Sequence, residues 1–342
     1  MKTWMKVVAV LVLVASIPLF AGTKGTSLAA EPEYTFYMIT HSQSADVFWA
    51  SVNKGMEDAA ASLNVKAVYL GSTTSGDVAQ MVSNLETVLA AKPDGIAISI
   101  TDPNALDPLL RGAIKQGIPV VAINVKDFRA EKDAIPYLRY IGEDSYMTGA
   151  TQAKAVLNAF QAMYGRVPKA AVFGTHEPGN IVQEIRAKGV IETVTAAGVK
   201  AAEITNITYD PAKASELMRA YLEAHPDVEY IATGNSAVAH WMVQLLKDLG
   251  RLGKTNEPMK EGNVFVGAID LDEQVLNDII AGDVVATIDQ QPYLQGYFGI
   301  QLLYLWNKHS YMPGSDIATG PFLVDKSNAD QMLKLLKEKG RL

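Results

Sequence analysis

Short apolar segments alternate with amphipathic segments along most of the chain, and this alternation constrains the fold more than any other feature. The segment GIAISI, residues 95–100, is apolar throughout, as expected of a parallel strand buried on both faces. A helical segment separates it from a second such run, IPVVAIN, at residues 118–124. Strands that alternate with helices of about 10 to 15 residues indicate βαβ units. The sequence therefore predicts an α/β fold with parallel sheets covered by helices.

The first unit of this pattern, residues 35–63, contains a predicted strand, TFYMIT, a loop, and a helix that begins at Val47. The face of the helix that packs on a sheet is predicted from apolar residues spaced by four, three and four positions: Val52, Met56, Ala59 and Leu63.

The start of this helix combines a carboxylate with two aromatic rings. Asp46 can cap the helix by accepting hydrogen bonds from its free N–H groups, and Phe48 and Trp49 follow at once. In open α/β sheets, ligands bind beyond the carboxyl ends of the strands. Rings that cover C–H faces and a carboxylate that accepts hydroxyl hydrogen bonds would suit a sugar there. The alternative is that both rings belong to the core and Asp46 is only a cap.

The two halves of the chain resemble each other over a short stretch. KPDGIAISITD in the first half parallels HPDVEYIATGN in the second. Each contains a helix end, Pro-Asp, a buried strand and then polar residues. The similarity fits two similar lobes, with the polar residues at these strand ends facing a common cleft.

The tail is predicted to return to both lobes. Residues 291–307 and 328–339 have helical patterns, and GPFLVD between them suits a short strand. We expect an N-terminal lobe of residues 31–141 plus 291–320 and a C-terminal lobe of residues 142–290 plus 321–342. Several crossings of the chain would form a hinge.

The N-terminal residues 1–30 have the pattern of a signal peptide. A basic start, MKTWMK, precedes the apolar run VVAVLVLVASIPLF and the small residues SLAA. The chain has no cysteine, so a disulfide is excluded, and a lipid anchor at the cleavage site is not expected. We expect a freely diffusing periplasmic monomer, and secretion to another compartment is the alternative.

Other classes of function find little support in the sequence. The formal net charge is −7, and no basic run is present, so nucleic-acid binding is not expected. The five histidines lack metal-ligand spacing, and GTHEPGN lacks the Lys and Ser/Thr of a phosphate loop. We therefore expect no metal, no cofactor and no enzymatic activity.

Six segments together resemble the sugar-binding proteins of bacterial ABC transporters, in the ribose-binding-like type I periplasmic family. They are FWASVNKGMEDAA, KPDGIAISITDP, GIPVVAIN, AHPDVEYIATGN, VGAID and GDVVATIDQQPYLQGY. The resemblance covers residues 33–324. It implies two Rossmann-like lobes joined by a three-strand hinge, with a neutral sugar or polyol held between them. It also implies a membrane permease as the partner.

The resemblance also implies ligand contacts at individual positions. It implies aromatic residues on both faces of the sugar and an arginine from one helix. It also implies carboxylate or amide contacts from residues at the ends of strands. The residues are Asp46, Phe48, Trp49, Asn124, Arg186, Tyr209, Asn235, Asp270 and Gln290. Asn124 and Val125 stand where the family usually has an acidic residue followed by arginine, so binding of ribose itself is in doubt.

Three other functions share parts of this pattern. A carboxylate pair, Asp46 and Asp270, could serve as acid and base in a glycosidase. A receptor for chemotaxis or signalling, including one for a furanose signal, would have the same fold as a transport protein. A repressor of this fold would need an N-terminal DNA-binding segment, where this chain has the predicted export signal instead.

Overall fold

The computed structural model describes residues 31–74 and 76–339. The predicted signal peptide, residues 1–30, lies outside these residues. In the described part, no helix combines the length and the apolar character needed to cross a bilayer.

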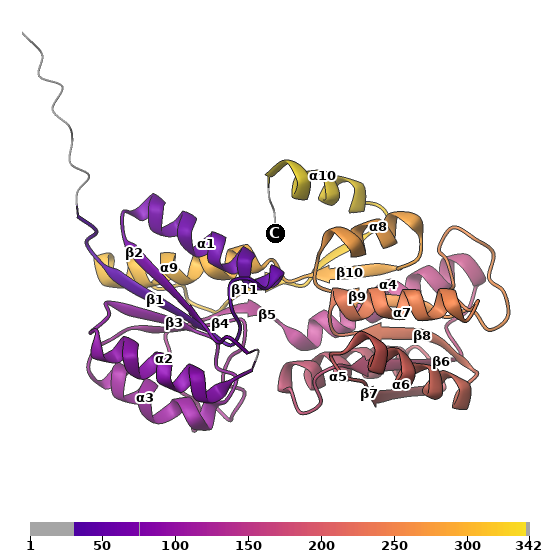
Figure 1. The fold of residues 1–342 in the computed structure, drawn as a ribbon, viewed down its shortest axis with the longest axis horizontal. Helices are drawn as coiled ribbons and strands as arrows, with labels where there is room; N and C mark the ends of the chain where they lie inside the picture. Colours follow the sequence, from indigo (N-terminus) through magenta and orange to yellow (C-terminus); the bar gives the residue numbers. More distant parts are fainter. Residues whose placement is uncertain (1–30, 75, 340–342) are drawn as a thin grey trace, which may run out of the picture. The chain divides into compact units, whose positions relative to one another are not determined.

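The first of two six-stranded sheets has the strand order β11-β5-β4-β3-β1-β2, and all its pairings are parallel. Helices α1 and α9 cover one face, and α2 and α3 cover the other (Figure 1). The strands are β1 (Thr35–Thr40), β2 (Lys66–Gly71), β3 (Gly95–Ile98), β4 (Val120–Ile123), β5 (Tyr140–Glu143) and β11 (Ile317–Gly320). The helices are α1 (Val47–Leu63), α2 (Val78–Ala90), α3 (Pro103–Lys115) and α9 (Pro292–His309).

The second sheet has the order β12-β10-β9-β8-β6-β7, and only its edge strand β12 is antiparallel. Helices α4 and α5 pack on one face, and α6, α7 and α8 pack on the other. The strands are β6 (Ala170–Thr175), β7 (Ala201–Asn206), β8 (Val228–Thr233), β9 (Phe265–Ile269), β10 (Ala286–Asp289) and β12 (Phe322–Asp325). The helices are α4 (Ser145–Tyr164), α5 (Ile181–Ala196), α6 (Pro211–Ala224), α7 (Ser236–Asp248), α8 (Glu273–Ala281) and α10 (Ala329–Lys339).

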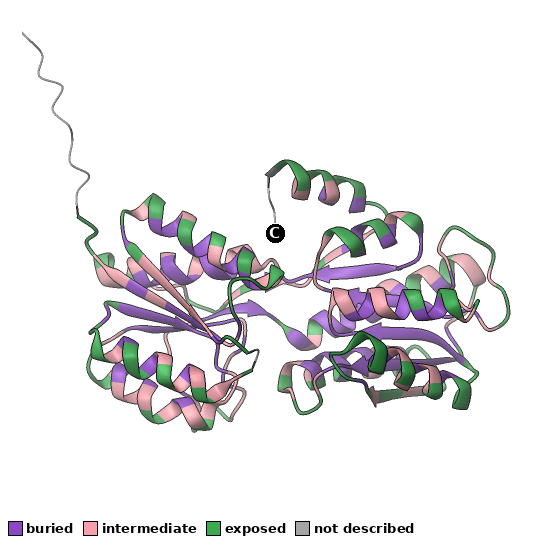
Figure 2. Cartoon of the chain, viewed as in Figure 1, coloured by how far each residue is buried: buried purple, intermediate pink, exposed green. Residues whose placement is uncertain are grey.

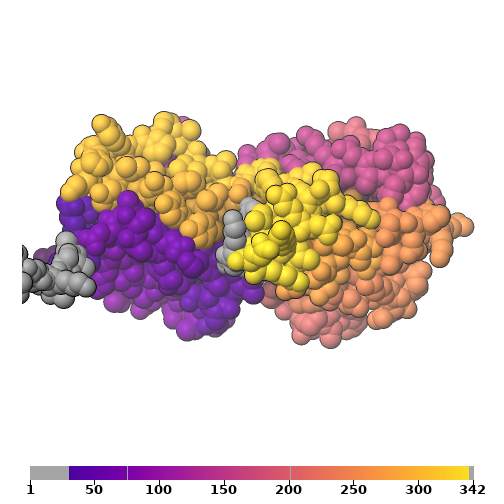
Figure 3. Space-filling model, turned by 90° about the horizontal axis from the view of Figure 1, so that it is seen from above, coloured from indigo at the N-terminus to yellow at the C-terminus, as the bar shows by residue number. Residues whose placement is uncertain are grey.

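The predicted fold class is confirmed. Central strands are buried on both faces (Figure 2), because each separates two hydrophobic clusters. The two similar sequence stretches fall on β3 and β8, which occupy equivalent positions in the two sheets. The chain passes between the sheets three times: after β5, after β10 and between β11 and β12. Helix α10, yellow in Figure 3, packs against α8.

Most helices begin at a polar residue that immediately follows a loop from a strand. The side chain of each of these residues accepts a hydrogen bond from an N–H of the first helical turn, which fixes where the helix starts. They are Asp46, Asp77, Asp102, Asp144, Asn180, Asp210, Asn235 and Asp272. The predicted capping role of Asp46 is therefore confirmed.

Strand β11 is an element that the sequence did not predict. It has four residues at the edge of the first sheet, and only one of them is buried. Such a strand has no apolar run and no clean alternation to mark it. Its partner β5 supplies the hydrogen bonds that define it.

Helices α1 and α9 pack at unusually close range because glycines lie at their crossing. A Cβ on Gly55 would lie 2.0 Å from the carbonyl oxygen of Tyr293. A Cβ on Gly296 would lie 1.9 Å from the carbonyl oxygen of Val52. No side chain fits at either position without separating the helices, so α9 is held firmly on the first sheet.

Gly55→Ala should lower the free energy of unfolding by about 2 kcal/mol or more, because the added methyl group overlaps backbone atoms. Gly112→Ala in α3 is a matched control, since a Cβ there meets nothing within 4 Å. The control should be neutral or stabilising by up to about 1 kcal/mol. Urea denaturation of both variants measures the difference, and equal stabilities would contradict the close packing.

Candidate functional site

A pocket of about 810 Å³ lies at the carboxyl ends of strands from both sheets. Its walls come from the segments that follow β1 and β4 of the first sheet and β6, β7, β8, β9 and β10 of the second. Parallel strands place all such loops on one edge of a sheet, which is why distant segments meet here. All nine predicted site residues line this pocket. That they contact a ligand stays a prediction.

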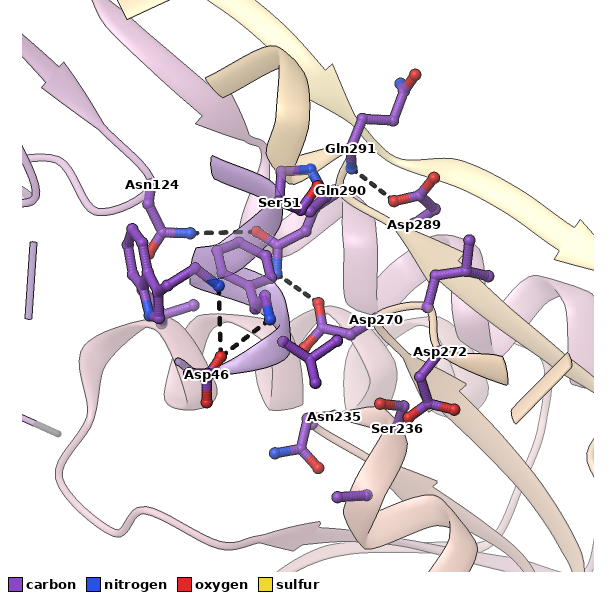
Figure 4. A pocket seen from close by; sticks show the side chains of 18 of the residues that line it. Asp46, Ser51, Asn124, Asn235, Ser236, Asp270, Asp272, Asp289, Gln290 and Gln291 are labelled. Atoms are coloured by element: carbon purple, nitrogen blue, oxygen red, sulfur yellow. Dashed lines mark hydrogen bonds between the residues drawn. The ribbon is translucent and has the colours of Figure 1, made fainter. Parts of the chain in front are cut away.

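One wall is aromatic and comes from the start of α1. Phe48 and Trp49 make an edge-to-face pair with centroids 5.1 Å apart, and His41 packs on Trp49 at 4.8 Å. Trp49 is only 4% exposed and belongs to the core of the first sheet, whereas Phe48 is half-buried. Asp46 accepts hydrogen bonds from the backbone N–H groups of both aromatic residues (Figure 4). The cap therefore fixes the rings, and Trp49 belongs to the core as the alternative interpretation has it. That the rings and Asp46 contact a sugar stays a prediction.

The second sheet supplies another aromatic surface. Tyr209 lies beside His176, with centroids 5.2 Å apart, and beside Trp241 at 5.3 Å. Tyr209 is 56% exposed, so most of its ring faces solvent or the pocket. Exposed aromatic surface of this kind can cover the C–H face of a ligand.

A chain of side-chain hydrogen bonds crosses the pocket floor between the sheets. The Asn124 amide nitrogen donates to Gln290 Oε1 at 3.4 Å and to Gln295 Oε1 at 3.2 Å. Gln290 in turn donates to Asp270 Oδ1 at 2.6 Å (Figure 4). Each group keeps further donor or acceptor capacity, so the floor can present fixed polar atoms to hydroxyl groups.

Two residues of this floor have left-handed backbone conformations. Asn124 has φ of 60° and Asp270 has φ of 68°. Asn and Asp tolerate this region better than other residues with a Cβ. At position 124 this conformation gives a physical reason for asparagine, although a glycine would also fit.

Arg186 on α5 is buried at the pocket wall. Its Nε donates to Glu143 Oε1 at 2.7 Å, and its Nη1 donates to the Gly234 carbonyl oxygen at 3.0 Å. Burial lowers the pKa of Arg186, but the charges of Glu143 and Asp270 more than offset this, so the net shift is upward. Arg186 is therefore charged, fixed and paired inside the protein.

Three buried polar atoms at the pocket have no hydrogen-bond partner within the described protein. They are Ser51 Oγ, His176 Nδ1 and Gln183 Oε1. An unpaired buried polar group costs about 1 to 3 kcal/mol, so each is a candidate ligand contact. Sequence analysis missed Ser51 and Gln183 because they lie inside helices, where polar residues carry no positional signal.

Burial sets the protonation states at the site. It raises the pKa of Asp270 to about 6, against the opposing effects of Arg186 and Gln290. It lowers the pKa of His41 and of His176 to about 4. Both histidines are therefore neutral near pH 7, and Asp270 titrates close to the physiological range. No group of His, Cys, Asp or Glu in the described residues could hold a metal ion.

Two sheets of equivalent strand order that contribute aromatic and polar side chains to one pocket define a solute-binding protein. The chain belongs to the family described as periplasmic binding protein domains, whose pattern matches residues 36–307. The predicted resemblance to the ribose-binding-like sugar-binding proteins of this family is confirmed.

Similar proteins cover nearly the whole chain. A xylose/arabinose-binding protein of Sulfolobus acidocaldarius is 28% identical over 90% of this chain and 75% of its own length. The D-allose-binding periplasmic protein of Escherichia coli is 27% identical over 81% of this chain and 85% of its own length. The crystal structure of a carbohydrate transporter from Acidothermus cellulolyticus in complex with myo-inositol is similar with a TM-score of 0.74. It is 29% identical and covers 91% of this chain and 100% of the solved chain.

Ligand affinity should fall by up to about tenfold between pH 7.5 and pH 5 if the ionised Asp270 accepts a ligand hydrogen bond. The pKa of about 6 leaves Asp270 mostly ionised at the higher pH and mostly protonated at the lower. His41 and His176, whose pKa values are about 4, stay neutral across this interval. Calorimetric titrations at both pH values measure the effect, and Asp270→Asn should remove it. An affinity that does not change with pH in the unsubstituted protein would contradict this role.

The raised pKa of Asp270 gives the folding stability a pH dependence opposite to that of ligand affinity. The folded state binds the Asp270 proton more tightly than the unfolded chain, whose carboxyl pKa is about 4. The contribution of Asp270 to the stability of the unliganded protein therefore decreases as the pH rises from about 4 to 6.

Proposed function

We propose that the protein captures a neutral sugar or polyol in the periplasm and delivers it to the membrane permease of an ABC transporter. The observation that carries this proposal is the composition of the pocket. Ring surfaces lie on two sides, a polar floor joins Asn124, Gln290 and Asp270, and the one lining arginine is already paired with a carboxylate. Polyhydroxylated compounds need such rings for their C–H faces and fixed donors and acceptors for their hydroxyls.

The names of similar proteins support the same ligand class. They include binding proteins for xylose or arabinose and for D-allose, and a complex with myo-inositol. We propose the nine predicted residues as ligand contacts, with Ser51, His176 and Gln183 as additional contacts. Ring stacking would supply affinity, and fully paired hydroxyl groups would supply specificity, because a missing hydroxyl leaves a buried partner unpaired.

The proposal also holds that the protein binds its ligand without chemical turnover. It further holds that the protein acts as a monomer without a lipid anchor. The proposed lobes are residues 31–141 with 291–320 and residues 142–290 with 321–342, and the boundary after residue 141 falls within β5 of the first sheet. The three chain passages between the sheets would act as the hinge that closes on the ligand. The closed form would then present both lobes to the permease.

A thermal-shift screen of residues 31–342 against pentoses, hexoses, deoxy-sugars, polyols and nucleosides tests the ligand class. A ligand that binds only the folded state raises the unfolding midpoint by mass action. We expect a large shift with one stereochemically related set and recovery of the ligand unchanged. No shift with any sugar or polyol, in protein refolded to remove bound ligand, would contradict the proposal.

Arg186→Ala and Asp270→Ala should abolish tight binding of the compound that the screen identifies, while the protein still folds. Asp102→Asn is the matched control, because Asp102 caps α3 and does not line the pocket. Asparagine caps a helix as well as aspartate does, so the control should keep full affinity. Unchanged affinity in both alanine variants would overturn the assignment of the site.

A further inference from the structure

Glu143 lies behind Arg186 and pairs with it inside the protein. Glu143 Oε1 is 2.7 Å from Arg186 Nε and 2.6 Å from Nη2. The two side chains are 1% and 6% exposed. Thr148 donates to the other carboxylate oxygen of Glu143 at 2.8 Å. The carboxylate is therefore held from both sides, and it does not itself line the pocket.

The backbone around this pair is closely packed. Glu143 is the last residue of β5, where the chain leaves the first sheet for α4. The Tyr140 hydroxyl lies 3.1 Å from the Glu143 carbonyl oxygen and 2.7 Å from that of Asn124. A Cβ on Gly149 of α4 would lie 2.0 Å from the Arg186 carbonyl oxygen. The backbone segments that carry Glu143 and Arg186 are thus each held by close contacts.

The guanidinium still has donors for a ligand. Of its five N–H groups, the one on Nε donates to Glu143 and one on Nη1 donates to Gly234, while Nη2 also lies 2.6 Å from the same Glu143 oxygen. The remaining N–H groups are on the two terminal nitrogens of a side chain that lines the pocket. Arg186 can therefore donate hydrogen bonds while its charge is compensated by a residue outside the pocket.

No other lysine or arginine among the described residues that line the pocket is free to pair with an anionic ligand. Lys54, the second cationic residue among those that line the pocket, is paired with Asp58. Asp46 and Asp270 line the same pocket. An anionic ligand beside Arg186 would lie among carboxylates without an uncompensated positive partner, which is unfavourable in a buried site.

We propose that Glu143 is a positioning residue that determines specificity. It orients Arg186 and neutralises it, so that the pocket accepts a neutral polyhydroxylated ligand and rejects an analogue that carries a carboxylate or phosphate. This inference rests on the proposed function, since it concerns the ligand class of the same pocket.

Glu143→Gln tests the proposal because it keeps the size of the side chain and one hydrogen-bond acceptor but removes the charge. Asp144→Asn is the matched control: it makes the same chemical change one residue along, at the exposed cap of α4. Calorimetry would measure association constants for D-glucuronate and D-galacturonate and for the neutral compounds D-glucose, D-galactose, D-allose, D-xylose, D-arabinose and myo-inositol.

The quantity compared is the ratio of the best neutral association constant to the best uronate constant. In Glu143→Gln this ratio should fall by at least about tenfold, the order expected when a buried charge gains a partner. In Asp144→Asn it should equal that of the unsubstituted protein. A purely structural role of Glu143 would weaken both kinds of ligand alike and leave the ratio unchanged, which would overturn the proposal.

Two further results keep the test decisive. If Glu143→Gln does not fold, Glu143→Asp withdraws the carboxylate by one methylene, and the ratio should shift in the same direction by a smaller factor. An unchanged ratio there would overturn the proposal. If the unsubstituted protein binds no sugar or polyol, either here or in the thermal-shift screen, the proposed function fails separately. Glu143→Gln should then still bind uronates more tightly than Asp144→Asn does, and equal binding would reject the role of Glu143.

Discussion

The pocket depends on one constraint, the parallel pairing of strands in two sheets with equivalent order. Parallel strands direct their carboxyl ends to the same edge, so every loop that follows a strand can contribute to a common site. The chain uses this edge repeatedly, from the turn before α1 to Gln290 at the end of β10. Several of these loops end in a helix cap, and Asp46 and Asn235 serve as caps and as pocket residues together.

Polar groups buried at this edge are stabilised mainly by one another. The bonds from Asn124 to Gln290 and from Gln290 to Asp270 link segments of both sheets, and Glu143 compensates the charge of Arg186. Breaking a buried ion pair by removing one partner costs about 3 to 5 kcal/mol. The groups that remain unpaired, such as Gln183 Oε1 and His176 Nδ1, are the ones that a ligand can satisfy.

Much of this arrangement could be predicted from the sequence. Buried parallel strands appear as continuous apolar runs, and the cap Asp46 marks the start of a helix, so the elements and the fold class followed from local patterns. The site residues followed from resemblance, and the structure brings all nine to one pocket. Strand β11 could not be predicted, because an edge strand of four residues is defined by its partner rather than by its own pattern. The pairing of Glu143 with Arg186 spans 43 positions, and nothing local to either residue indicates it.

A crystal structure of the protein with the compound that gives the largest thermal shift tests the central claim most directly. The account predicts electron density for one polyhydroxylated molecule between the ring of Phe48 and that of Tyr209. Its hydroxyls should lie within hydrogen-bond distance of Arg186, Asp270 and Gln290, and Glu143 should remain bound to Arg186. Density for the compound outside this pocket, or an Arg186 that has left Glu143 to pair with the ligand, would contradict the account.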